Sequence, residues 1–315
     1  MEKSVSLIDP MVSSNFDVMK VLAIFMVAAE HYFKEYELLW VPSTVGLLIF
    51  SYSSGYFTAF KYHDNFSRKD FWKNKIRRLG INLLVVNAFL TVLFLFQGRS
   101  GIFSWLSLVN LIGMNGVLNW FGIPNLSPFG AGMWFFTLLL IFYVVYPFLS
   151  GMKKSSLTVL IVLSVCSAYF LNRNMQMGHS LWLTACGFLI GVWFQKLKIQ
   201  IPLFIAVIFC VIIFISMVSA NFVFRFNNLN FFFILFFSLS LIHACIQVNF
   251  PEWLRTPFLF CTGSILEIYL IHSYLFYTFT DIRFLDFILS MAVIIILAKI
   301  FSFVSSKLLW TLFKK

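Results

Sequence analysis

The chain has 315 residues, of which 61% are hydrophobic and 11% are charged. Because a soluble domain carries about 25% charged residues, this composition excludes a soluble protein and indicates a polytopic membrane protein. The net charge of +11 is explained by Lys and Arg in cytoplasmic loops, so we expect no nucleic-acid partner. The five cysteines are scattered among apolar runs, so we expect neither disulfides nor a metal site.

Ten apolar stretches approach the roughly 20 residues that a membrane-spanning helix needs. Between positions 61 and 78, seven Lys and Arg stand against two Asp, and such an excess marks a cytoplasmic loop. With an even number of spans, both termini are then cytoplasmic. We therefore predict an all-α transmembrane helix bundle of about ten spans, forming a single domain over residues 1–315 with no appended soluble domain. The expected spans are residues 18–33, 38–60, 79–97, 132–150, 156–172, 180–195, 201–220, 229–248, 258–279 and 284–306.

The first span carries ionisable side chains. Lys20 and His31 are eleven positions apart, almost a whole number of helical turns, so they share one helix face about 16 Å apart along the axis. Glu30 stands beside His31. Ionisable groups are costly inside a bilayer and indicate a functional site, and a neutral imidazole can act as a general base. We assign catalytic roles to all three; the structural alternatives are a Lys20 that snorkels and a His31 bonded to a backbone carbonyl.

The second span is interrupted by small and polar residues at positions 50–56. A glycine among serines allows the backbone to approach a ligand, or it allows ordinary packing of one helix on another. A basic, aromatic segment at positions 71–78 precedes the third span. It attracts anionic lipid, or it holds the phosphates of a cytosolic donor. The candidate donor-binding residues from these two segments are Lys73, Lys75, Arg78, Ser54, Gly55 and Tyr56.

The longest outer segment, residues 98–131, contains several Gly and Asn together with Pro and Trp. We expect it to form a partly re-entrant or interfacial cap. The fourth span opens on Trp134, which fits an aromatic belt at the outer interface, and the ninth contains a second intramembrane histidine. The candidates for the site of a second substrate, which accepts a group from the donor, or for structural roles, are Trp134, Tyr143, Tyr269 and His272.

Taken together and in this order, these segments resemble the acyltransferase-3 family of integral membrane O-acyltransferases. The resemblance spans nearly the whole chain and rests on five blocks. In chain order their matching positions are Asp17, Lys20 and His31; Phe50 through Tyr56; Phe71, Lys75 and Arg78; Trp134 through Pro147; and Tyr269 through His272.

The chain departs from the family pattern at two places. Lys20 replaces an arginine, which keeps the charge but loses the planar bidentate fork. Leu139, Leu140 and Ile141 stand where many members have paired acidic residues, so a role tied to those carboxylates does not transfer.

The resemblance implies transfer of an acyl group, usually acetyl, from cytosolic acyl-CoA to a hydroxyl of a glycan or lipid-linked sugar at the outer face, with His31 as general base. It implies acetyl-CoA or another acyl-CoA as co-substrate, no tightly bound cofactor, and a multi-pass location in a bacterial plasma or inner membrane. A transporter or flippase of a small amphipathic or lipid-linked solute also fits ten spans with buried charges. Such folds usually contain inverted repeats, and we find no such correspondence between the two halves.

Overall fold

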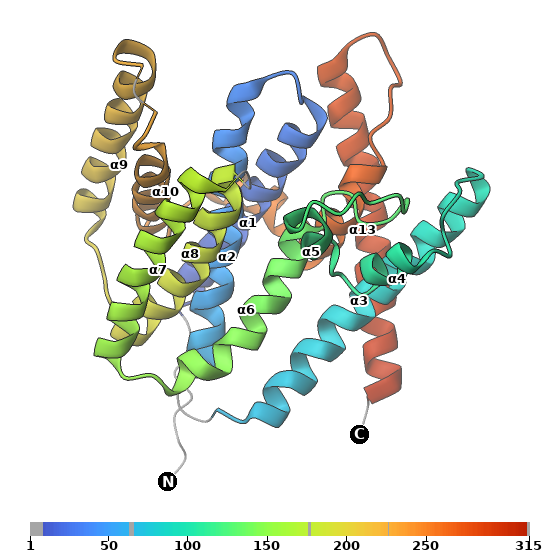
Figure 1. The fold of residues 1–315 in the computed structure, drawn as a ribbon, viewed down its shortest axis with the longest axis horizontal. Coiled ribbons are helices and arrows are strands. Elements are labelled where there is room, and N and C mark those ends of the chain that lie inside the picture. Colours follow the sequence, from blue (N-terminus) through green and yellow to red (C-terminus); the bar gives the residue numbers. More distant parts are fainter. Residues whose placement is uncertain (1–8, 63–65, 176–177, 226, 314–315) are drawn as a thin grey trace. The chain divides into compact units, whose positions relative to one another are not determined.

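The computed structural model describes residues 9–62, 66–175, 178–225 and 227–313, and every regular element in these ranges is helical (Figure 1). The α-helices are α1 Pro10–Tyr32, α2 Trp40–Lys61, α3 Arg68–Phe96, α4 Trp105–Leu111, α5 Asn115–Trp120, α6 Trp134–Gly151, α7 Lys154–Asn174, α8 Gly178–Leu197, α9 Leu203–Val218, α10 Asn230–Cys245, α11 Glu252–Cys261, α12 Ile265–Ile271 and α13 Arg283–Phe313. The short turns of other helix types are η1 Glu37–Leu39, η2 Ser219–Val223, η3 Thr262–Ser264 and η4 His272–Tyr274.

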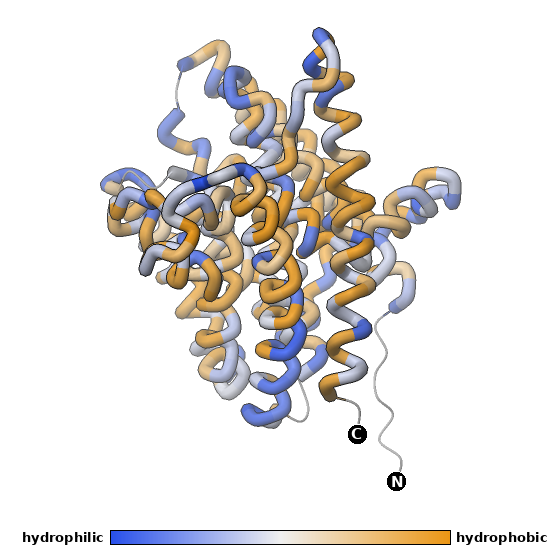
Figure 2. The backbone as a smooth tube through the Cα atoms, turned by 90° about the vertical axis from the view of Figure 1, so that its right-hand side faces the viewer, coloured by the Kyte–Doolittle hydropathy of each residue, from blue (hydrophilic) through white to orange (hydrophobic). Residues whose placement is uncertain are grey.

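The expected all-α polytopic membrane protein is confirmed. Among the described residues, nine helical segments are long and apolar enough to cross a membrane, and α13 is hydrophobic along most of its length (Figure 2). The eighth expected span, residues 229–248, corresponds to α10, an apolar helix of only 16 residues. The ninth expected span, residues 258–279, is not one helix, because η3 separates α11 from α12 and α12 ends at Ile271.

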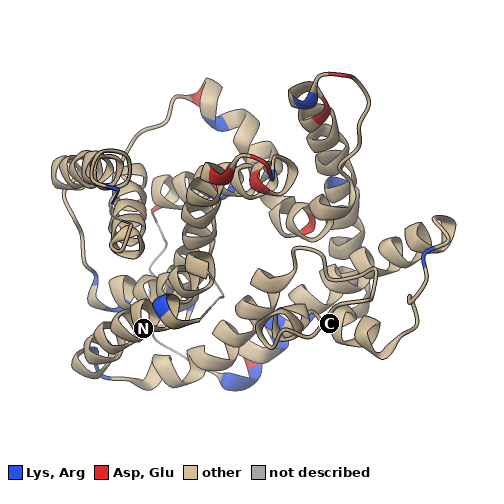
Figure 3. Ribbon diagram, turned by 45° about the horizontal axis from the view of Figure 1, so that its top comes forward, with Lys and Arg blue, Asp and Glu red and all other residues tan. Residues whose placement is uncertain are grey.

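The third helix begins earlier than the apolar pattern predicts. The Ser67 hydroxyl accepts a hydrogen bond from the Asp70 N–H at 3.3 Å, which is the usual way to cap a helix start. The basic residues at positions 71–78 therefore form the first turns of α3 and are not a loop before it (Figures 2 and 3).

The chain forms two compact units. The first comprises Met1–Val27, Trp40–His63 and Met152–Thr262, and the second comprises Ala28–Leu39, Asp64–Gly151 and Gly263–Lys315. The helix α1 is continuous from the first unit into the second.

In the first unit, α2 and α8 pack closely through glycines. A Cβ atom at Gly55 would meet the carbonyl oxygen of Phe188, and one at Gly191 would meet the carbonyl oxygen of Tyr52. Small residues let membrane helices approach backbone to backbone. The small residues of positions 50–56 thus serve helix packing at Gly55, and α2 is a continuous helix through this segment.

This contact predicts an asymmetry between two glycines. Gly191→Ala should lower the free energy of unfolding by about 1–3 kcal/mol, because the added methyl group overpacks the α2–α8 contact. Gly80→Ala is the matched control: nothing lies within 4 Å of a Cβ atom there, so alanine should be neutral or slightly stabilising. Thermal unfolding of the two purified variants in detergent measures the difference, and equal midpoints would contradict the close contact.

In the second unit, polar side chains tie the segment 98–131 to the helices that flank it. The Asn87 side-chain amide donates to the Leu111 carbonyl at 2.8 Å, and the Thr137 hydroxyl donates to the Gly113 carbonyl at 2.7 Å. The Asn115 amide donates to the Gly130 carbonyl. The first two bonds tie the middle of the segment, between α4 and α5, to α3 and α6, and the third ties α5 to the end of the segment before α6.

Candidate active site

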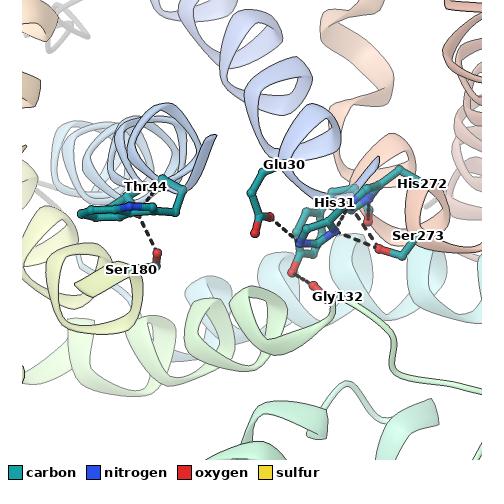
Figure 4. Close-up of polar contacts among 9 residues, drawn as sticks. Glu30, His31, Thr44, Gly132, Ser180, His272 and Ser273 are labelled. Carbon is teal, nitrogen blue, oxygen red and sulfur yellow. Dashed lines mark hydrogen bonds and ion pairs between the residues drawn. The ribbon is translucent and has the colours of Figure 1, made fainter. Parts of the chain in front are cut away.

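Two histidines that are far apart in the sequence meet in the second unit. The His31 Nδ1 and His272 Nε2 atoms are 2.8 Å apart, and the Ser273 hydroxyl lies 3.1 Å from His31 Nδ1 and 3.2 Å from His272 Nε2. The two rings are nearly parallel, with centroids 4.9 Å apart. Figure 4 shows the three side chains pointing toward one another. His31 and His272, which the sequence marks separately, therefore belong to one cluster.

The end of α1 is held in place by packing and by an ion pair. The Tyr32 ring packs against Phe276 and Phe287 at centroid distances of 5.1 and 5.5 Å. Just beyond α1, Glu35 forms a two-pronged ion pair with Arg283. A backbone hydrogen bond and the Arg283 guanidinium hold the pKa of the Glu35 carboxyl below its ordinary value, so the pair stays ionised at neutral pH. These contacts restrain the helix end that carries His31.

The hydrogen-bond partners assign the proton positions on both rings. The His272 Nδ1 lies 2.7 Å from the Tyr269 carbonyl oxygen, and because a carbonyl only accepts, this nitrogen must carry the hydrogen. In neutral His272 the Nε2 is then an acceptor, and it receives the hydrogen of His31 Nδ1. The free lone pair of a neutral His31 is consequently on Nε2. This chain of bonds selects one tautomer of His31, as a carboxylate does in a catalytic triad.

Exposure distinguishes the two histidines. His272 is fully buried, whereas the His31 side chain is 24% exposed and its Nε2 lies 3.3 Å from a Glu30 carboxylate oxygen. Only His31 can therefore present its basic nitrogen to a substrate. Glu30 stands where its charge would stabilise the imidazolium that forms when His31 takes up a proton.

A glycine makes room for the cluster. Gly132 has a φ of +71°, and a Cβ atom there would lie 2.5 Å from the Ser273 hydroxyl oxygen and 3.1 Å from His31 Cε1. The Tyr269 hydroxyl donates to the Gly132 carbonyl. Both the left-handed backbone and the lack of space require glycine at this position.

Lys20 has a different partner. It lies on α1 in the first unit, where its ammonium group is 2.6 Å from an Asp17 carboxylate oxygen and 5.6 Å from the centre of the Phe57 ring. Asp17 and Lys20 are on neighbouring turns of one helix face. Lys20 is therefore paired with a carboxylate of its own helix.

The basic start of α3 includes an aromatic contact. The Lys75 ammonium lies 3.8 Å from the centre of the Tyr143 ring and 5.7 Å from that of Phe71, so two candidates that the sequence places in different sites are neighbours. Lys73 and Arg78 are exposed.

The remaining candidates lie elsewhere. Ser54, Gly55 and Tyr56 are on α2 in the first unit, with Gly55 against α8 and the Tyr56 ring 5.4 Å from that of Phe16. Trp134 is the first residue of α6, and its ring is 6.4 Å from that of Phe135.

Sequence reasoning missed three features of the cluster. Ser273 follows His272 directly but belongs to no recognisable motif, and the carbonyl of Tyr269 acts through its backbone. Gly132 is one of two glycines just before Trp134, which was the only available signal that the backbone there adopts an unusual conformation.

The cluster combines a partly exposed base, a buried histidine that selects its tautomer and a neighbouring carboxylate. This arrangement can take a proton from a hydroxyl group, as acyl transfer to an alcohol requires. A family profile described as an acyltransferase domain matches residues 13–307, nearly the whole chain. The chain belongs to the acyltransferase-3 family. Comparisons with curated proteins and with solved structures found no match. Among the described residues of this acyltransferase, no group of three or more His, Cys, Asp or Glu could hold a metal ion.

Proposed function

We propose that this membrane acyltransferase moves an acetyl group from cytosolic acetyl-CoA to a hydroxyl of a cell-surface or exported glycan, with His31 as the general base. The observation that carries the proposal is the 2.8 Å contact between His31 and the buried His272, because it leaves the exposed Nε2 of His31 with a free lone pair.

The reaction follows from this arrangement. The His31 Nε2 takes the proton of the acceptor hydroxyl while the hydroxyl oxygen attacks the thioester carbonyl. The carbon–sulfur bond breaks, the acetyl ester forms, and the coenzyme A thiolate leaves and receives a proton. The Glu30 carboxylate stabilises the imidazolium between these steps. Burial of the cluster strengthens each of these electrostatic contacts.

The first turns of α3 are the proposed site for the phosphates of the donor. Lys75 and Arg78 lie on one face of α3, and positive side chains bind phosphate through short, charge-assisted hydrogen bonds. The Tyr143 ring beside the Lys75 ammonium supports the side chain in one position. Attraction to anionic lipid is the competing explanation.

A double substitution separates the two explanations. Lys75→Ala with Arg78→Ala should raise the KM for acetyl-CoA by at least about tenfold, since each lost charge-assisted bond contributes about 1.5–3 kcal/mol, and should leave the KM for the acceptor unchanged. Initial rates with each substrate varied in turn measure both constants. If both constants keep their wild-type values, the segment is only a lipid and topology anchor.

Lys20 is proposed to act through its positive charge. Lys20→Arg should retain most of the activity and its pairing with Asp17, whereas Lys20→Met should lose most of the activity because it removes the positive charge and leaves the Asp17 carboxylate unpaired. Acetylation by membranes, normalised to monodisperse protein, measures the effect. A fully active Lys20→Met protein would contradict the role, and Asp17→Asn in the Lys20→Met background shows whether the unpaired carboxylate causes the loss.

A test in cells addresses the function as a whole. Cells that express the wild-type chain should carry base-labile acetyl esters on a surface or exported glycan, which mild alkali releases as acetate. Cells that express His31→Ala at an equal level should not. Equal acetate release from the two would contradict the proposal, and His31-dependent uptake or export of an unmodified solute would favour a transporter.

A further inference from the structure

A second cluster of aromatic and polar side chains lies in the first unit, where α2 and α8 begin. The Trp40 and His179 rings are stacked with centroids 5.1 Å apart and planes inclined by 17°. The Thr44 hydroxyl lies 2.6 Å from the Ser180 hydroxyl and donates to the Trp40 carbonyl (Figure 4). These bonds join the starts of the two helices.

Two polar atoms near the start of α8 have no partner. Among the described residues, neither His179 Nδ1 nor Trp182 Nε1 has a hydrogen-bond partner, although both atoms are buried. His179 and Trp182 are three residues apart on α8 and so share one face of the helix. Buried polar atoms are nearly always paired, so two orphans on one helix face leave hydrogen-bonding capacity that a ligand can use.

The orphan atoms and the rings together describe the ligand. The indole nitrogen can only donate a hydrogen bond, whereas the imidazole Nδ1 can donate or accept, so adjacent hydroxyl groups satisfy both. The flat indole rings offer apolar surface beside polar atoms, as a pyranose needs for its C–H face and its hydroxyl rim. The cluster residues include no Lys, Arg, Asp or Glu, which favours an uncharged ligand over a phospholipid headgroup.

We propose that Trp40, His179 and Trp182 form a binding site for a neutral sugar. The site adds to the proposed function a place where the acceptor sugar binds. Only the role of the bound sugar as acetyl acceptor rests on the proposed function. Binding itself requires no acyl-CoA and is measured separately.

The test is saturation-transfer NMR on the full chain in nanodiscs free of sugar detergents. The probes are the methyl glycosides of glucose, galactose, mannose, rhamnose and N-acetylglucosamine, with methyl glucuronide as the charged comparison. At least one neutral glycoside should receive saturation from the wild-type protein, and the glucuronide should receive less.

Two tryptophans of α8 provide matched variants. Trp182→Phe keeps an aromatic ring but removes the orphan N–H, and it should raise the Kd of the bound glycoside at least about fivefold. Trp193→Phe is the control, because the Trp193 Nε1 already donates to the Thr158 hydroxyl at 2.9 Å, and it should leave the Kd unchanged. Trp40→Ala should also weaken binding.

Two results would overturn the site: no neutral glycoside bound by the wild type, or the same Kd for wild type and Trp182→Phe. Either result with acetyl transfer intact rejects the sugar site alone. Specific binding without acetyl transfer rejects the proposed function alone.

Discussion

His31→Ala should lower kcat for acetyl transfer by about 10²–10⁴-fold, the usual cost of losing a general base. The KM for acetyl-CoA should change little, because the proposed phosphate contacts lie on α3. Steady-state rates of purified protein, with acetyl-CoA varied at saturating acceptor, measure both constants.

The matched control is a variant that removes a polar neighbour of the two histidines and keeps the proposed base. Ser273→Ala removes a neighbour of the same two nitrogens but leaves the two rings in place. It should lose no more than about tenfold in kcat, the effect of one hydrogen bond. If Ser273→Ala is as inactive as His31→Ala and the wild-type protein yields a trapped acetyl ester on Ser273, then Ser273 is a covalent nucleophile. Near-normal turnover of His31→Ala would exclude His31 as the base.

His272 should act as a positioning residue, and its variants have the second largest expected effect. His272→Leu removes the nearer acceptor of the His31 Nδ1–H, and only the Ser273 hydroxyl, 3.1 Å away, remains to accept it. A poorly paired buried donor costs about 1–3 kcal/mol, or about 5- to 150-fold in kcat. His272→Gln keeps an acceptor oxygen within reach and should retain more activity than His272→Leu.

The pH dependence tests the positioning role of His272. If His272 selects the tautomer of His31, its removal should reduce kcat at every pH while the KM for acetyl-CoA stays constant, and glutamine at position 272 should restore part of kcat. Rates of both variants across pH, normalised to monodisperse protein, give the comparison. Equal activity of the leucine and glutamine variants would show that the hydrogen bond to His31 does not matter for catalysis.

Hydrophobicity alone was enough to locate the membrane helices, because each of the ten apolar stretches contains a helix of the structure. The hydrophobic pattern predicted the ends and interruptions of the helices less accurately. The apolar pattern placed the third helix at residue 79, whereas the Ser67 cap starts α3 at Arg68. It likewise placed the ninth span at residues 258–279, whereas the corresponding helical segment is Glu252–Tyr274 and contains the turn Thr262–Ser264.

In the candidate site, too, some residues could be predicted from the sequence and others could not. His31 could be found from the sequence because an ionisable residue stands out in an apolar helix. Its contact with His272 could not, since the two are 241 positions apart and no local pattern connects them. The tautomer depends on the Tyr269 carbonyl, and the need for glycine at position 132 depends on a φ of +71°. Neither property can be read from residue types.

The most direct test is acetyl transfer by the purified chain alone. The wild-type protein in proteoliposomes, supplied with acetyl-labelled acetyl-CoA and a glycan acceptor on the opposite side, should form a labelled, base-labile ester on the glycan, and His31→Ala should form about 10²–10⁴-fold less per folded molecule. Equal ester formation by the two proteins, or no ester from the wild type with acetyl-CoA, would contradict a histidine-dependent acetyltransferase.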